Sequence, residues 1–125
     1  MARFLIVDDE ESWRQFHAKA IQAVKQDVYI DLADSAKSGY DKVLENIKTP
    51  YDYVLTDMQM ESDYLPKLAG EWFIEQIKTL NSYFNTKIVI ISASPKIKLI
   101  AENYNVDFIP KRTAVTTLDS YKAIL

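Results

Sequence analysis

Four places along the chain carry acids, a hydroxyl or an ammonium directly after an apolar run. Asp8 and Asp9 follow the first run, and Asp57 follows a later one. Ser92 and Lys111 stand in the same relation to two further runs. Two carboxylates about 4 Å apart repel by roughly 4 kcal/mol at an effective dielectric constant of about 20, so converging acids would need a cation. Mg²⁺, or Mn²⁺ in its place, is a hard ion that prefers carboxylate, carbonyl and water oxygens and would suit them.

These residue types fit phosphoryl transfer. A carboxylate can attack phosphorus and form an acyl phosphate. The transition state spreads negative charge over the phosphoryl oxygens, and a protein promotes the reaction mainly by positioning and neutralising that charge. Asp57 is the expected nucleophile, Lys111 a fixed positive charge and Ser92 a hydrogen-bonding hydroxyl.

The apolar pattern predicts the elements that would position these groups. Strands are expected at about 4–7, 28–32, 53–55, 87–91 and 106–109, and helical spacing of apolar residues follows each of them. Such an alternation predicts an α/β domain with a doubly wound, parallel, five-stranded sheet covered by helices on both faces. Ligands bind such sheets at the carboxyl ends of the strands, which is where the chemistry-bearing residues fall.

Several local details are also predicted. The helix after the third strand is expected to carry its apolar stripe from Phe73 to Phe84. Ser94 is expected to cap the next helix, with Pro95 at its first position. The last helix is expected over about 114–124. The connection from Met60 to Ala69 is longer and more irregular than the others.

Length and composition limit the class of protein. The 125 residues suit one domain, 1–125, and 48% hydrophobic with 26% charged residues is an ordinary globular balance. A net charge of −3 argues against a nucleic-acid-binding domain. The absence of cysteine excludes disulfides, thiol catalysis and cysteine-bound zinc. No apolar run approaches a membrane span, so a cytoplasmic location without a membrane partner is expected.

Taken together, the motifs resemble the receiver domain of two-component response regulators over essentially the whole chain. The resemblance implies a flavodoxin-like (βα)5 fold with strand order 2-1-3-4-5. The matching motifs, in family order, are Phe4-Leu5-Ile6-Val7-Asp8-Asp9-Glu10, Asp57-Met58-Gln59-Met60, Ser92-Ala93 and Lys111.

The resemblance implies a role for each matching acid. Asp57 would be the phosphoacceptor and also a ligand of the metal ion. Asp8 and Asp9 would be the metal-binding acids, Asp9 directly and Asp8 either directly or through water. Gln59 would bind the metal ion through its backbone carbonyl, so the identity of its side chain would not matter for this role.

The same resemblance implies a conformational switch. Phosphorylation would draw Ser92 and Lys111 toward Asp57, Ala93 would leave room for the phosphoryl group, and Phe108 would move with the Ser92 hydroxyl. The surface around the fourth helix, fifth strand and fifth helix would change and present itself to an unknown downstream protein or output domain. The phosphoryl donor would be a histidine kinase or a histidine phosphotransfer protein, and the chain would be a switch rather than a turnover enzyme.

Two departures from the family pattern and several alternatives stay open. Glu61 and Arg112 stand where family members usually have proline, and the long Met60–Ala69 connection could contact a partner. A degenerate receiver that acts only through protein contacts is the main alternative. A phosphohydrolase with an aspartate nucleophile is disfavoured, because Gln59 stands at the position of the second aspartate of its Asp-x-Asp motif. A flavin-binding domain is disfavoured, because an acidic run follows the first strand where a phosphate-binding loop would be needed. Asp8 and Asp9 could instead cap the first helix, and His17 is expected to be a structural or surface residue.

Overall fold

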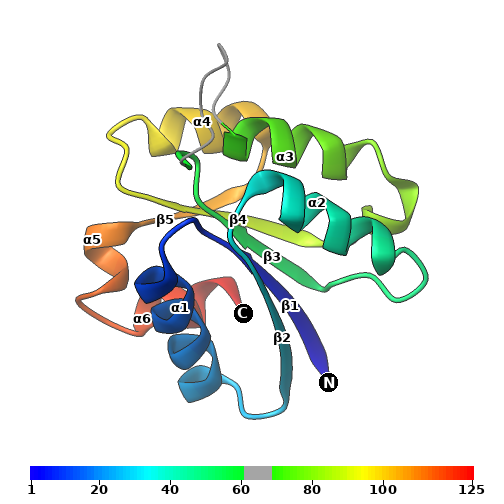
Figure 1. Ribbon diagram of the computed structural model, residues 1–125. Coiled ribbons are helices and arrows are strands. Elements are labelled where there is room, and N and C mark those ends of the chain that lie inside the picture. Colours follow the sequence, from blue (N-terminus) through cyan, green and yellow to red (C-terminus); the bar gives the residue numbers. More distant parts are fainter. Residues whose placement is uncertain (61–68) are drawn as a thin grey trace.

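One parallel sheet organises the chain, for which the computed structural model describes residues 1–60 and 69–125. The strand order is β2-β1-β3-β4-β5, as predicted, and every neighbouring pair is parallel (Figure 1). The predicted Met60–Ala69 connection, with Glu61, therefore lies almost wholly outside the described residues. The strands are β1 Ala2–Val7, β2 Val28–Ala33, β3 Tyr53–Thr56, β4 Lys87–Ser92 and β5 Asp107–Pro110.

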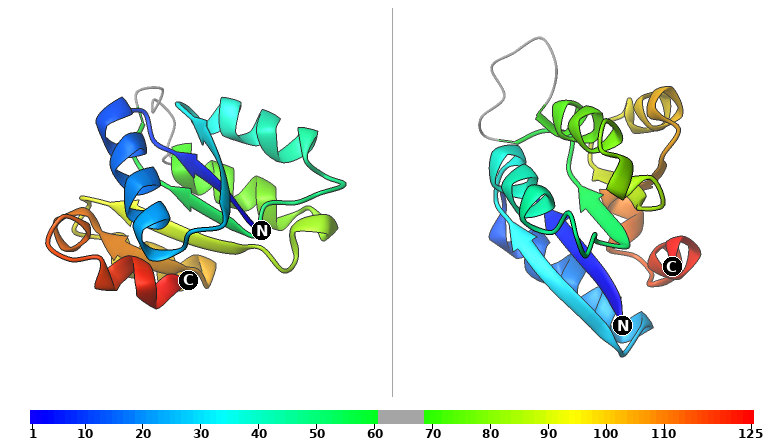
Figure 2. Two further views of the ribbon diagram at one scale, coloured as in Figure 1. Left: turned by 90° about the horizontal axis from the view of Figure 1, so that it is seen from below. Right: turned by 90° about the vertical axis from the view of Figure 1, so that its right-hand side faces the viewer.

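Helices cover both faces of this sheet. Helices α2, α3 and α4 lie on one face, and α1, α5 and α6 lie on the other (Figures 1 and 2). This is the doubly wound arrangement that the alternation predicted and the flavodoxin-like fold that the resemblance implied. The helices are α1 Glu11–Val24, α2 Ala36–Glu45, α3 Ala69–Lys78, the 3-10 turn η1 Asn81–Tyr83, α4 Ile97–Tyr104, α5 Lys111–Ala114 and α6 Asp119–Ile124.

Alternate residues of each strand supply the two cores. Leu5 and Val7 of β1 face the core beneath α2, α3 and α4, whereas Phe4 and Ile6 face the core beneath α1 and α6. All four side chains are at most 1% exposed. Such burial on both faces explains why the strand reads as a continuous apolar run rather than as an alternating one.

The start of the fourth helix differs from the prediction. The helix begins at Ile97 with Lys96 at its N-cap, so Ser94 is not the cap. The Ser94 hydroxyl instead accepts a hydrogen bond from the Lys96 N–H at 3.2 Å, and the Ser94 carbonyl accepts one from Ile97 at 3.3 Å. Pro95 therefore lies in a turn that precedes the helix, because a serine side chain can hold a tight turn as readily as a helix end.

The helical stripe predicted from Phe73 to Phe84 is interrupted. Helix α3 ends at Lys78, and the Thr79 hydroxyl donates to the Gln76 carbonyl at 2.7 Å. The following turn changes the direction in which side chains point. Phe84 is consequently 87% exposed and does not belong to the core.

The last helix, predicted over about 114–124, begins later than expected: α6 covers only Asp119–Ile124, and the separate short helix α5 ends at Ala114. The Thr116 hydroxyl donates to the Thr113 carbonyl at 2.8 Å, and the Thr117 hydroxyl accepts from the Asp119 N–H at 3.1 Å. Threonine hydroxyls that bond to nearby backbone compete with helical hydrogen bonds, and Val115 adds a further β-branched residue at the break.

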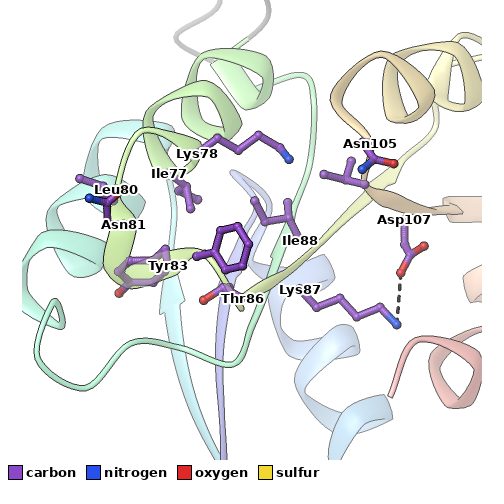
Figure 3. Close-up of a pocket in the computed structure, with 12 residues that line it drawn as sticks. Ile77, Lys78, Leu80, Asn81, Tyr83, Thr86, Lys87, Ile88, Asn105 and Asp107 are labelled. Carbon is purple, nitrogen blue, oxygen red and sulfur yellow. Dashed lines mark ion pairs between the residues drawn. The ribbon is translucent and has the colours of Figure 1, made fainter.

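A hollow of about 600 Å³ lies where β4 and β5 begin, next to the end of α3 (Figure 3). Its lining includes Lys78, Lys87 and Asp107, and Lys87 pairs with Asp107 at 3.2 Å on an exposed surface. This end of the sheet is opposite to the carboxyl ends of the strands. No described helix is long and apolar enough to cross a membrane.

Candidate functional site

The predicted acids converge where β1 and β3 end. Asp8, Asp9 and Asp57 each offer a carboxylate oxygen, and these oxygens all lie within 4.8 Å of one another. The parallel register causes this convergence, because Val7 pairs with Thr56 at the ends of the two strands. A depression of about 390 Å³ opens beside them. It is lined by Asp9, Glu10, Asp57, Gln59, Met60, Ser92, Ala93 and Lys111.

Asp57 is held firmly at the floor of this depression. Its residue is 6% exposed, and its backbone N–H donates to the Val7 carbonyl at 3.0 Å. Oδ1 accepts the N–H of Met58 at 2.7 Å, and Oδ2 accepts from Lys111 Nζ at 2.9 Å. Both oxygens are therefore oriented by donors, which fixes the carboxylate in place.

Asp8 is the most deeply buried acid of the site, at 1% exposed. Oδ1 accepts the Glu10 N–H at 3.0 Å, whereas Oδ2 accepts no hydrogen bond of normal geometry and has Lys111 Nζ 3.2 Å away. Burial raises the pKa of the Asp8 carboxyl to about 6, against the opposing effects of the Glu10 N–H and the Lys111 charge. The N-cap of α1 is Glu10, without a side-chain cap, so Asp8 and Asp9 are not its N-cap residues.

The Lys111 side chain reaches Asp8 and Asp57 from the end of β5, the edge strand of the sheet. It follows β5, opens α5, and its ammonium contacts both Asp8 and Asp57. Burial by itself would lower the pKa of Lys111, but the hydrogen bond to Asp57 and the charges of both acids raise it above its ordinary value. The lysine is therefore charged and stands as an internal counter-ion.

Of the remaining predicted residues, Gln59, Ser92 and Ala93 line the depression and Phe108 does not. Gln59 is exposed, with its N–H 3.4 Å from Asp57 Oδ1. Ser92 is 2% exposed, and its hydroxyl accepts from the Ser94 N–H at 3.1 Å. Ala93 lines the depression. Phe108 does not line it and is only partly buried, where it packs against the core beneath α3 and α4.

Three residues that lie beside the site were not among the predicted site residues. Trp13 has Lys111 Nζ 4.8 Å from its ring centroid, a cation–π distance. His17, one helical turn later, is 2% exposed with Nε2 3.9 Å from Asp8 Oδ2, so of the two predicted roles, structural or surface, it has the structural one. Gly70 lies so close to the site that an added Cβ would be 2.1 Å from the Asp57 carbonyl oxygen. The sequence did offer a signal for Trp13 and His17: they are four positions apart on the helix that follows the acids, so they lie on the same face of that helix.

The arrangement combines a fixed carboxylate, two further acids and a fixed ammonium around an open depression. At 4.8 Å and an effective dielectric constant of about 20, each pair of ionised acids repels by about 3.5 kcal/mol. Lys111 contacts Asp8 and Asp57 and offsets part of the repulsion between these two. The site can therefore attract a divalent cation and expose the Asp57 carboxylate to an electrophile at the same time.

Comparison with known proteins gives one family. The model of the response regulator receiver domain matches residues 4–121. No curated protein matches at the required significance.

Solved structures share the fold over the whole chain. A chemotaxis response regulator of Vibrio cholerae, CheY4, has 22% sequence identity and a TM-score of 0.78, with 100% of this chain and 99% of that chain covered. The response regulator TrrA of Thermotoga maritima, solved in complex with Mg²⁺ and BeF, has 21% identity and a TM-score of 0.75, with 100% of both chains covered. The N-terminal domain of an uncharacterized protein of Wolinella succinogenes has 23% identity and a TM-score of 0.69, with 99% of this chain and 94% of that chain covered.

Proposed function

This chain belongs to the response regulator receiver domain family, and we propose that it accepts a phosphoryl group on Asp57 and thereby switches a protein-interaction surface. The observation that carries the proposal is the Asp57 carboxylate, held 2.9 Å from Lys111 Nζ at the floor of an open acidic depression. Receiver domains are phosphoacceptor switches rather than turnover enzymes, and this assignment extends to the present chain.

The donor set fits Mg²⁺, or Mn²⁺ in its place. Asp8, Asp9 and Asp57 provide hard oxygens within 4.8 Å of one another, and Asp8 Oδ2 is buried without a hydrogen bond. The backbone carbonyl of Gln59 would complete the set at the exposed side. When bound, the divalent ion would neutralise charge on the phosphoryl oxygens and on the three acids.

The residues of the chain would divide the work of the transfer. A carboxylate oxygen of Asp57 attacks phosphorus, the new oxygen–phosphorus bond forms, and the bond from phosphorus to the donor's imidazole nitrogen breaks, with its electron pair returning to that nitrogen. Lys111 then exchanges its contact with Asp57 for one with a phosphoryl oxygen. Ser92 donates its hydroxyl to another, and Ala93 leaves the space that the group requires.

The proposed donor is a histidine kinase or a histidine phosphotransfer protein, which would place the reaction in the cytoplasm. The proposed readout is a changed surface around α4, β5 and the last helix, which is α6 in the structure, with Phe108 responding to Ser92. A phosphoryl group adds about −1.5 to −2 charges at pH 7, enough to redirect both the serine and the lysine. The extent of the domain over 1–125 stays a prediction.

The proposal is tested by incubating the protein with phosphoramidate or acetyl phosphate and Mg²⁺, followed by intact-mass measurement. The wild type should gain one phosphoryl group, and Asp57→Asn should gain none while remaining folded. Asp41→Asn, which removes the same charge at an exposed position of α2, is the matched control and should behave as wild type. An unlabelled wild type would support the degenerate receiver instead, and labelling that survives Asp57→Asn would move the acceptor elsewhere.

A further inference from the structure

The only histidine of the chain connects the acidic site with the last helix. His17 lies on α1 and is 2% exposed. Its Nε2 is 3.9 Å from Asp8 Oδ2, and its Nδ1 is 2.7 Å from the Tyr121 hydroxyl on α6. Tyr121 is fully buried, so its hydroxyl has been taken out of water and needs the partner that the imidazole provides.

Protonation chemistry decides how this bridge is arranged. A neutral imidazole has one N–H donor and one acceptor nitrogen. If the Tyr121 hydroxyl donates to Nδ1, the ring proton is on Nε2 and faces the Asp8 carboxylate. The other tautomer would direct a nitrogen lone pair at that carboxylate, which is electrostatically unfavourable.

The Nε2 end of this buried bridge faces a carboxylate oxygen that lacks a hydrogen bond. Asp8 Oδ2 has Lys111 Nζ at 3.2 Å, but that ammonium is shared with Asp57. If Lys111 moves to a phosphoryl group on Asp57, the His17 ring stays as the donor beside Asp8 Oδ2, while the Glu10 N–H remains on Oδ1. At 3.9 Å the present contact is polar rather than a hydrogen bond, so a small movement of either group would strengthen it.

We propose that His17 is a positioning residue for Asp8, with its Nε2–H directed at the carboxylate and its Nδ1 bound by Tyr121, so that α6 is mechanically linked to the acidic site. The inference rests on the proposed function, since it concerns an acid of the proposed metal site. It adds a route from the site to α6 that does not pass through Ser92 or Phe108.

The tautomer provides the first test. With one histidine in the chain, the two ring nitrogens can be assigned without ambiguity by nitrogen-15 NMR. We expect the proton on Nε2 at pH 7, and a shift of both ring nitrogens when Mg²⁺ is added. A proton on Nδ1 would overturn the proposal, as would ring signals that do not respond to Mg²⁺ concentrations that saturate the protein.

Two substitutions provide the second test, because the amide of glutamine reaches about as far as Nε2 and that of asparagine about as far as Nδ1. His17→Asn should weaken Mg²⁺ binding about tenfold, the lower end of the effect of removing an outer-shell partner, whereas His17→Gln should restore most of it. Tyr121→Phe should weaken binding less than His17→Asn.

Mg²⁺ titrations of the folded protein, followed by Trp fluorescence and by mass after phosphoramidate treatment, measure these effects. Trp13 stacks on His17 at 5.4 Å between ring centroids and is a local reporter. A general structural role would lower stability in both His17 variants without separating their Mg²⁺ affinities. Equal, wild-type affinity in both variants would overturn this inference alone. A wild type that neither binds Mg²⁺ nor becomes phosphorylated would overturn the proposed function itself.

Discussion

Replacing Asp8 by asparagine is expected to stabilise the metal-free protein. Asp8 is 1% exposed, and burial raises the pKa of its carboxyl from the ordinary 3.8 to about 6. The folded state therefore binds the proton more tightly than the unfolded state does. Ionising Asp8 thus costs folding free energy, and the cost grows as the pH rises from about 4 to about 6 and is constant above that.

The size of the effect follows from this pKa shift. The difference between 3.8 and about 6 is roughly 2 pKa units, and each unit corresponds to 1.36 kcal/mol, so the ionised carboxylate opposes folding by about 3 kcal/mol at pH 7. Asparagine keeps the oxygen that accepts the Glu10 N–H and removes the charge. We therefore expect Asp8→Asn to raise the free energy of unfolding by about 1–3 kcal/mol at pH 7, with a much smaller gain near pH 4.

Urea unfolding between pH 4 and 8, in the presence of a chelator, measures this difference. Asp41→Asn is the matched control, because it removes one negative charge at an exposed position and should change stability by less than about 0.5 kcal/mol. Mg²⁺ should stabilise the wild type, by about 2.7 kcal/mol at a concentration one hundred times its Kd, and Asp8→Asn much less.

The reasoning would be refuted if Asp8→Asn were no more stable than the wild type at pH 7. It would also be refuted if the difference between the two proteins were the same at pH 4 and pH 7. Either result would mean that the Asp8 carboxylate is adequately solvated or compensated in the metal-free fold.

Two further substitutions test other parts of the site. Lys111→Met should lower the free energy of unfolding of the metal-free protein by about 3 kcal/mol or more, since it leaves two buried acids without their cation. Urea unfolding with and without Mg²⁺ measures this loss, and Mg²⁺ should restore part of the lost stability. Unchanged stability of the metal-free variant would contradict the ion-pair geometry. Gly70→Ala should cost about 1–3 kcal/mol and slow phosphorylation, because its Cβ would be 2.1 Å from the Asp57 carbonyl oxygen. Gly39→Ala is the control for the second, since its Cβ would meet only side-chain atoms, at 2.9 Å or more, and an equal loss of phosphorylation in both variants would contradict a specific effect at Asp57.

The sequence alone was sufficient to predict the sheet. Continuous apolar runs alternate with helical spacing, and this pattern depends only on which faces of each element are buried. The same local rule predicted that Asp8, Asp57 and Lys111 would meet at one edge, because the carboxyl ends of parallel strands always share an edge. The confirmed strand order, in contrast, came from resemblance to a family and not from periodicity.

Local competition between hydrogen bonds could not be predicted from periodicity. Ser94 forms a turn instead of a helix cap, and threonine side chains end α3 and separate α5 from α6. In each case a hydroxyl bonds to nearby backbone, and the choice between cap, turn and helix depends on geometry that residue types do not specify.

The part of the site that only the tertiary structure revealed is made of contacts between residues far apart in the chain. His17 and Tyr121 are 104 positions apart, yet their side chains form a buried hydrogen bond beside Asp8. Helical spacing indicates that His17 belongs to the inward face of α1, but it carries no information about which helix packs there. The packing of α1 against α6 supplies that information, and with it the surroundings that keep the histidine neutral and next to the acid.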